Sequence, residues 1–343
     1  MAALGMWVYE LSKIVGHYAG NAGVDPEDRT RNWIAQFPAS SQEPLARALT
    51  RTLERTYIRD QEVEEYFTSS VSNADFWRDT HVCRGAQYGK SHEVMTSIVT
   101  DAIKSKLGQG VLDESRSGWR TARNHIFIDD AIFSGSRAIE DYGQWWSNSL
   151  PQANRRTPSD GPLNIYFWTY IRHTAGEEAV RRWIDSTLTP RGIPFTLTFH
   201  SAKTYEDRDA QRNASDVLWP SVMTEKAGSS RLFLATRHDF LRTSGGGSST
   251  VFPLESDRKI LEAELLDASI DISARLEKPW TPLGYGRKPF GFGSLSISQR
   301  NCPNNAPIAL WWNTDYWSPL FPRVTYADRD AEKFRGQDDE VPF

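Results

Sequence analysis

The sequence predicts an α/β protein with a mostly parallel sheet that helices cover on both faces. Strand-like runs alternate with helical patterns, which is the order expected of parallel strands joined by crossover helices. These segments occupy residues 125–129, 136–147, 164–170, 174–186 and 195–200. The strand-like runs are continuously apolar, as in strands buried on both faces. The second helix opens with Thr174 and Glu177 at the spacing of a capping box, and residues 231–235 form a further strand candidate.

The N-terminal region, residues 1–75, is predicted to be helical. Apolar residues recur every three to four positions between residues 43 and 70, which indicates one amphipathic helix or a pair of helices. They are Leu45, Leu49, Leu53, Tyr57, Val63, Tyr66 and Phe67. A shorter helix at residues 30–37 is expected to stop at Pro38.

The C-terminal region, residues 256–343, is predicted to begin with a helix at about residues 257–278 and to continue as a loop-rich cap. Residues 243–250 before it are small and resemble a flexible loop. Glycine, proline, asparagine and tryptophan are concentrated in residues 279–322. The α/β core is therefore assigned to residues 76–255.

Composition excludes several classes of protein. A net charge of −4 argues against a polyanion-binding protein that works by bulk charge. Cys83 and Cys302 are too few for a disulfide framework or an all-cysteine zinc site. No apolar run reaches the roughly 18–20 residues of a membrane span, and the N-terminus lacks the features of a secretory signal. A cytoplasmic protein is therefore expected.

An acidic pair followed by a small-residue turn is the most informative motif. Asp129 and Asp130 end a predicted strand, and Ser134, Gly135 and Ser136 open the next helix. The amides of such a turn and the positive end of the helix dipole suit a phosphate. Adjacent carboxylates can bind two ribose hydroxyls or hold Mg²⁺. The motif predicts a ribose 5-phosphate site, although a solvated strand end or a helix cap would use the same residue types.

This motif resembles the phosphoribosyl diphosphate (PRPP) signature of type I phosphoribosyltransferases. The resemblance implies that Asp129 and Asp130 are the catalytic acids that hold the ribose hydroxyls and Mg²⁺. It also implies that Ser134, Gly135 and Ser136 bind the 5-phosphate. Arg137 stands where that family usually has a small hydroxyl residue. It would either add a charged phosphate contact or block the loop.

A second phosphate-binding candidate precedes a helix-like run at residues 93–104. Gly85, Gly89, Lys90 and Ser91 resemble a Walker A loop, but three residues separate the glycines instead of four. A P-loop NTPase is therefore an alternative function. In a transferase, Gly89, Lys90 and Ser91 would bind diphosphate in the first strand–helix loop, with Lys90 as a point charge. A surface turn with a solvated lysine is the plainer interpretation.

Motifs in the C-terminal region make the resemblance to phosphoribosyltransferases more specific. The motifs are GYG at residues 284–286, PNNAPIALW at 303–311 and WSPLFPR at 317–323, together with NWIAQF at 32–37. They resemble a phosphoribosyltransferase-like family of bacterial conflict and antiphage systems, over about residues 31–323. That resemblance implies an effector beside a reverse transcriptase and its RNA or DNA in a retron system. It implies ribosyl transfer or cleavage on PRPP or a nucleotide, without a membrane partner. A catalytically degenerate module that senses a nucleotide or docks a partner is the alternative.

The remaining chemistry-bearing residues point to no further site. None of the seven histidines forms an H-x-x-x-H or H-E-x-x-H pattern, so no zinc site is expected. The two cysteines are expected to be buried or inert. The arginines at positions 116, 120, 123, 155 and 156 are either solvated or contacts to nucleic acid.

Overall fold

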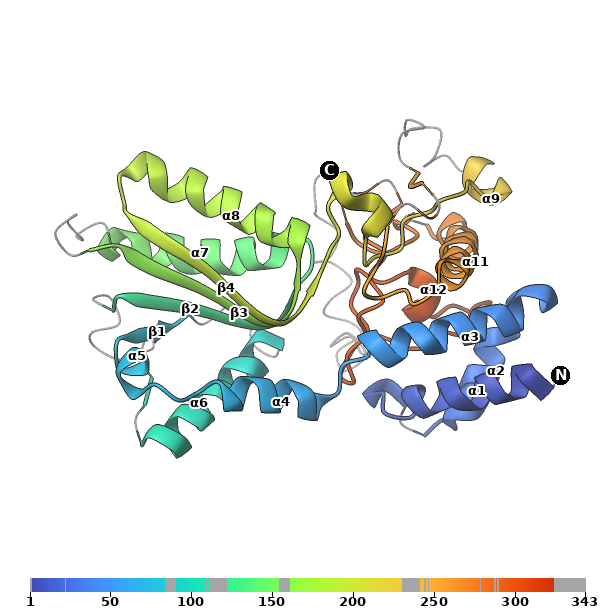
Figure 1. Ribbon diagram of the computed structural model, residues 1–343, viewed down its shortest axis with the longest axis horizontal. Helices are drawn as coiled ribbons and strands as arrows, with labels where there is room; N and C mark the ends of the chain where they lie inside the picture. Colours follow the sequence, from blue (N-terminus) through green and yellow to red (C-terminus); the bar gives the residue numbers. More distant parts are fainter. Residues whose placement is uncertain are drawn as a thin grey trace. The chain divides into compact units, whose positions relative to one another are not determined.

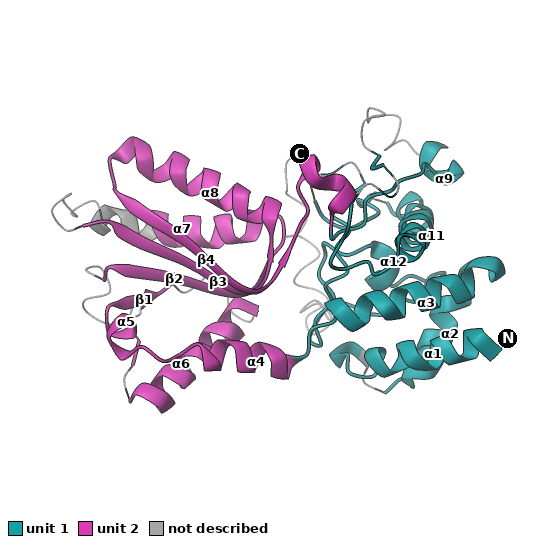
Figure 2. Cartoon of the chain, in the orientation of Figure 1, with its two compact units in different colours: residues 1–59, 216–343 teal, residues 60–215 magenta. Residues whose placement is uncertain are grey.

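The computed structural model divides the chain into two compact units, which Figure 2 shows in different colours. One unit joins residues 1–59 to residues 216–343, and the other is residues 60–215. These units do not coincide with the three segments 1–75, 76–255 and 256–343 assigned from the sequence. The structure describes residues 2–21, 23–83, 91–108, 110–111, 122–153, 161–229, 241–243, 245, 247–277, 279–286, 288 and 290–323.

A four-stranded, all-parallel sheet forms the centre of the 60–215 unit, in the order β1-β2-β3-β4. The strands are β1 (Thr80–Val82), β2 (Asn124–Ile132), β3 (Leu163–His173) and β4 (Phe195–Tyr205). The predicted parallel sheet and its three longer strands are confirmed. The short β1 was not predicted as a strand, and the candidate at residues 231–235 lies outside the described residues.

Helices lie on both sides of this sheet (Figure 1). The helices of the unit are α4 (Asp60–Ser69), α5 (Ala74–Arg78), α6 (Ser91–Leu107), α7 (Ser136–Ala153) and α8 (Thr174–Leu188), with 3-10 turns at Thr189–Arg191 and Asp209–Ala214. Figure 1 shows α7 and α8 on one side and α4 and α6 on the other. The chain thus changes side at β2, because α6 precedes that strand and α7 follows it. Ligands of open α/β sheets bind outside the carboxyl ends of the strands.

The core under α7 and α8 is aliphatic and aromatic. Its buried members include Phe127, Phe167 and Val180, together with Tyr142 and Trp145 of α7. On the α4 side, Phe67 and Trp168 meet edge to face with ring centroids 5.0 Å apart. Apolar side chains therefore project from both faces of β2 and β3 and are buried there, as the continuously apolar runs predicted.

The other unit contains both ends of the described chain. Its helices are α1 (Ala2–Val15), α2 (Pro26–Ile34), α3 (Ala39–Thr56), α9 (Glu225–Ser229), α11 (Glu255–Ala274) and α12 (Ile308–Trp311), with a 3-10 turn at Ala19–Asn21. The amphipathic pattern at residues 43–70 is a helix pair, because the extended backbone of Tyr57 ends α3 before α4 begins. Among the described residues, no helix is both long enough and apolar enough to cross a bilayer.

Tryptophans hold the loop-rich C-terminal segment in this unit. The indole N–H groups of Trp33 and Trp317 both donate to the carbonyl oxygen of Ala309, each at 2.9 Å. The indole of Trp311 donates to Ala306 at 2.9 Å. Buried indoles need such acceptors, so part of the unusual tryptophan content, 13 residues, joins the N-terminal helices to the C-terminal segment.

A buried ionic network lies beside α11 in the same unit. Glu262 accepts hydrogen bonds from Arg242 at 2.7 Å and from Arg258 at 2.8 Å. All three side chains are almost completely buried. Glu255 also accepts a hydrogen bond from Arg242 at 2.9 Å, so two carboxylates balance the two guanidinium charges.

Candidate functional site

Asp129 lies near the carboxyl end of β2 and is fixed by two hydrogen bonds to one of its oxygens. The Ser91 hydroxyl and the Asp130 backbone N–H both donate to Oδ1 of Asp129 at 2.8 Å. Only 5% of Asp129 is exposed. Because Ser91 is the first residue of α6, this contact brings the end of the predicted diphosphate loop to the predicted ribose acids. Gly89 and Lys90 lie outside the described residues.

The two carboxyl groups are held in an environment that opposes their ionisation. Burial raises the pKa of Asp129, while the bonds from Ser91 and Asp130 and the charge of Arg137 partly oppose the shift. Burial raises the pKa of Asp130 above the usual range as well, and the adjacent Asp129 charge raises it further. A cation placed between the carboxylates would relieve both effects. Two oxygen donors suit Mg²⁺, which ordinarily keeps several waters or substrate oxygens as its remaining ligands.

The Ser134–Ser136 turn begins α7 directly after β2. Gly135 has φ +79°, a left-handed conformation that glycine adopts without strain. The Ser136 N–H donates to Ser134 Oγ at 3.4 Å, and Ile139 N–H donates to the Gly135 carbonyl at 2.9 Å. Both serines are partly exposed. The turn therefore places two accessible hydroxyls at the positive end of an 18-residue helix, as a phosphate site requires.

Two glycines let this turn pack directly against the start of α8. A Cβ at Gly135 would lie 2.6 Å from the carbonyl oxygen of Gly176. A Cβ at Gly176 would lie 2.0 Å from the carbonyl oxygen of Phe133. Sequence reasoning did not single out Gly176, and the signal available was a glycine in the first turn of a predicted helix.

The prediction of a capping box at the start of α8 is wrong. The helix is capped by Asp207, whose Oδ1 accepts from the Ala175 N–H at 2.7 Å. Thr174 instead donates its hydroxyl to Glu206 at 2.8 Å. Glu177 pairs with Arg172 at 2.7 Å rather than reaching back to the cap. Residues just beyond β4, more than thirty positions away, therefore supply the cap.

Arg137 is held along α7 by an ion pair with Asp141, one turn further on. Its side chain remains 40% exposed, while that of Asp141 is 1% exposed. The guanidinium stays close enough to Asp129 to favour that carboxylate's ionised form. It therefore adds positive charge next to the acidic pair. Its predicted role in phosphate binding stays a prediction.

Two histidines adjoin the site and are structural. His92 is 4% exposed, its Nδ1 lies 2.5 Å from the carbonyl oxygen of Ile128, and its ring stacks on Phe127. His173, which precedes α8, is fully buried and stacks on Phe133 with ring centroids 5.3 Å apart. These contacts fix the starts of α6 and α8 to the sheet. His92 was not predicted, because an isolated histidine carries no sequence signal.

The fold and this geometry define a class of protein. A parallel sheet, an acidic pair at a strand end and a Ser-Gly-Ser turn at the following helix are typical of phosphoribosyltransferases. The chain belongs to the PRTase-CE family, whose model matches residues 30–323. This match confirms the predicted phosphoribosyltransferase-like family and fold over most of the chain. A search of curated proteins finds no significant match.

Proposed function

We propose that this protein binds PRPP or a related nucleotide at the carboxyl end of β2 and catalyses ribosyl transfer or cleavage. The observation that carries the proposal is the hydrogen bond from Ser91 at the start of α6 to Asp129. It joins the predicted diphosphate segment to the acidic pair, while the Ser134–Ser136 turn follows on the same strand. The proposed sites for diphosphate, ribose and 5-phosphate would then follow the order of these groups in one ribosyl diphosphate molecule.

Each group has a defined task in such a reaction. The bond between C1 of the ribose and the leaving diphosphate breaks, and an acceptor or water forms the new bond at C1. Asp129 and Asp130 hold the ribose hydroxyls, so that C1 is fixed relative to both leaving group and acceptor. Ser134, Gly135 and Ser136 anchor the 5-phosphate through amides and hydroxyls. Ser91 orients Asp129, and Lys90 offsets diphosphate charge. Mg²⁺, held by the acidic pair, would supply charge neutralisation at the diphosphate.

The test is a titration of the purified protein with PRPP, NAD and ATP in the presence of Mg²⁺, with products followed by mass spectrometry. Asp129→Asn and Asp130→Asn should abolish turnover and weaken binding. Asp101→Asn, an exposed acid on α6, is the matched control and should behave like wild type. Turnover that survives both substitutions at the acidic pair would overturn the assignment. ATP hydrolysis that is insensitive to them would favour the P-loop NTPase alternative.

A nucleotide-sensing module without turnover is the second candidate. The pairing of Arg137 with Asp141 favours it, because this bulky side chain occupies the position after the phosphate turn where a small hydroxyl residue is usual. Tight binding of PRPP or a nucleotide without any product would support this candidate over an enzyme.

We further propose that the protein acts in the cytoplasm as an effector of a retron-type antiphage system. Family membership over residues 30–323 supports this proposal, together with the resemblance of the motifs at residues 303–311 and 317–323. Its partner would be a reverse transcriptase with its RNA or DNA. Co-expression with the neighbouring genes should yield a stable complex, and growth arrest should depend on Asp129. A protein that stays alone and harmless in that setting would contradict the proposal.

A further inference from the structure

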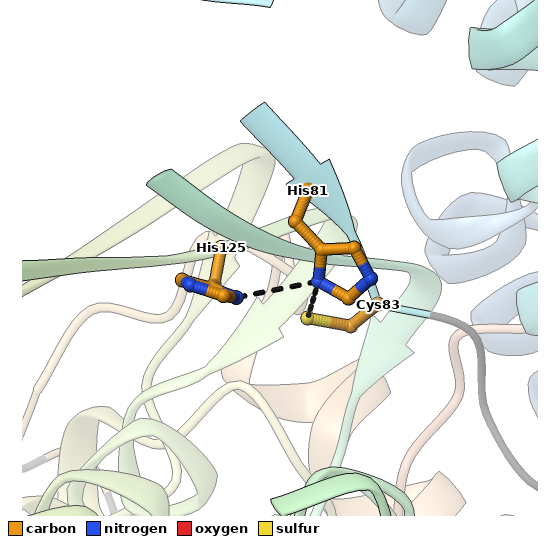
Figure 3. Close-up of side chains that lie close together, drawn as sticks. All are labelled: His81, Cys83 and His125. Atoms are coloured by element: carbon orange, nitrogen blue, oxygen red, sulfur yellow. Dashed lines mark hydrogen bonds between the residues drawn. The ribbon is translucent and has the colours of Figure 1, made fainter. Parts of the chain in front are cut away.

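Three side chains capable of binding a transition metal meet at the amino-terminal part of the sheet. His81 of β1 and His125 of β2 are register partners in the parallel ladder. Cys83 follows His81 by two positions, so its side chain lies on the same face of the sheet. Figure 3 shows the Cys83 thiol and the His125 ring both approaching the His81 ring. In the described part of the chain, these three form a group close enough to share one ion.

The distances between the donor atoms suit a tetrahedral ion. Nδ1 of His81 lies 3.2 Å from Nδ1 of His125 and 3.8 Å from Sγ of Cys83. All three donor atoms lie within 4.8 Å of one another. Tetrahedral zinc, with bonds of about 2.0–2.1 Å to nitrogen and 2.3 Å to sulfur, places its ligand atoms about 3.3–3.6 Å apart. Shifts of a few tenths of an ångström would therefore bring these two distances to that geometry.

The surroundings favour an ion that prefers nitrogen and sulfur. His81, Cys83 and His125 are all less than 5% exposed. Trp145 of α7 stacks on the His81 ring, with centroids 5.2 Å apart, and lies beside His125 at the same separation. Two imidazoles and a thiolate are ligands of zinc or copper and not of Mg²⁺ or Ca²⁺. The aromatic ring of Trp145 fixes the two ligand rings.

We propose that His81, Cys83 and His125 bind one tetrahedral transition-metal ion of the zinc class. The fourth position is left to a water molecule or to Tyr142, which belongs to the same buried cluster. The Tyr142 hydroxyl is buried and has no hydrogen-bond partner among the described residues. The site lies four residues before Asp129 on β2, roughly 13 Å along the strand, and is separate from the acidic pair.

Binding is balanced by the release of one proton. The thiol of Cys83 loses its proton to solvent, and sulfur then binds the ion as a thiolate. The hydrogen that the two Nδ1 atoms share moves to the Nε2 atom of the same ring, so that both Nδ1 atoms coordinate. No electron is transferred. The ion would join the three-residue β1 to β2 and so fix the strand from which the diphosphate segment departs.

The absence of a zinc pattern in the sequence follows from this arrangement. The ligands come from two strands separated by more than forty residues, and only the strand register brings them together. The expectation that no zinc site exists rested on local spacing alone.

The test measures metal binding directly in protein that carries no polyhistidine tag. Zinc content per chain is determined by plasma mass spectrometry. Zn²⁺ affinity is determined by competition with a chromophoric chelator. Cys83→Ser removes the thiolate with little change in volume, and Cys302→Ser changes the other buried cysteine as the matched control. Wild type and Cys302→Ser should bind one Zn²⁺ per chain. Cys83→Ser should bind it more than about 100-fold more weakly, since even outer-sphere changes cost 10–100-fold.

A second measurement keeps the proposal falsifiable if the variants do not fold. X-ray absorption of wild type loaded with Zn²⁺ should show two nitrogen ligands and one sulfur ligand, at about 2.0 and 2.3 Å. His125→Gln with circular dichroism then distinguishes a lost ligand from lost structure. Wild type that binds no stoichiometric Zn²⁺, or equal affinity in wild type and Cys83→Ser, would overturn the site. Stoichiometric binding of copper but not zinc would overturn its assignment to the zinc class.

Discussion

Substitution of Gly176 tests whether the phosphate turn is positioned by its packing against α8. An alanine Cβ at this position would lie 2.0 Å from the carbonyl oxygen of Phe133 and 3.0 Å from Cγ2 of Ile132. Contacts of this kind below 3.0 Å are essentially never seen, so the two backbones must separate by at least about 1 Å. Both atoms in the closest contact belong to rigid elements, because Phe133 follows β2 and Gly176 lies in the first turn of α8. Overpacking of this kind costs about 1–3 kcal/mol of stability.

The same displacement acts on the proposed site. The turn at Ser134–Ser136 follows Phe133 directly, so it would move with Phe133 and change its position relative to the acidic pair. A misplacement of about 1 Å in a catalytic constellation costs on the order of 100-fold in rate. We therefore expect Gly176→Ala to lose both stability and about two orders of magnitude in kcat/KM for the substrate that the titration identifies. Urea unfolding and steady-state kinetics measure the two effects.

Gly5→Ala is the matched control for this prediction. Gly5 lies in α1, and a Cβ added there would meet no atom within 4 Å. The change should stabilise the protein by about 0.5–1 kcal/mol, because alanine loses less backbone entropy in a helix. The reasoning fails if Gly176→Ala unfolds at the wild-type urea concentration and keeps its activity. Lost stability with unchanged kinetics would show that α8 does not position the turn.

Three further predictions concern charge. Asp130→Asn should raise the free energy of unfolding near neutral pH by roughly 1–3 kcal/mol. Folding raises the pKa of both carboxyl groups, so the wild type loses stability as the pH rises above about 4, where carboxyl groups of the unfolded chain ionise. Urea unfolding from pH 5 to 8 should show that slope in wild type and a flatter one in the variant, and parallel slopes would contradict it. Asp207→Ala should cost about 1 kcal/mol by uncapping α8, measured in the same way, and no change would mean that water replaces the cap. Glu262→Gln should cost about 3–5 kcal/mol, because Arg242 and Arg258 would remain buried without their shared carboxylate, and thermal unfolding unchanged from wild type would disprove that dependence.

The local sequence pattern predicted individual helices and strands better than it predicted the contacts between them. The strands β2 and β3 were visible as long apolar runs, and β4 was visible as a run of residue types typical of strands. The three residues of β1 are too few for any periodicity. The acid–turn motif was visible because its residues are contiguous. The cap that Asp207 provides and the pairing of His81 with His125 depend on partners distant in the chain, which no local spacing records.

The division of the chain into two units also depends on contacts between distant segments, which the local sequence does not record. Trp33 and Trp317 were visible as unusual tryptophans in two unusual motifs. Their shared acceptor, the carbonyl of Ala309, could not be predicted, because it depends on how segments 276 residues apart pack together. The predicted boundary at residue 75 followed a continuous helical pattern, but the structure assigns α4 and α5 to the unit that contains the sheet.

One unit joins residues 1–59 to residues 216–343, and this arrangement limits the order in which the two units can fold during synthesis. Residues 60–215 are contiguous, so the sheet unit can fold as soon as they leave the ribosome. The first 59 residues emerge earlier, yet the rest of their unit begins only at residue 216. The hydrogen bond from Trp33 to Ala309 can form only after Ala309 has been synthesised. A chain that terminates before that residue cannot complete the unit. Products of translation that end soon after residue 215 would therefore carry the candidate site without the completed unit that contains residues 1–59.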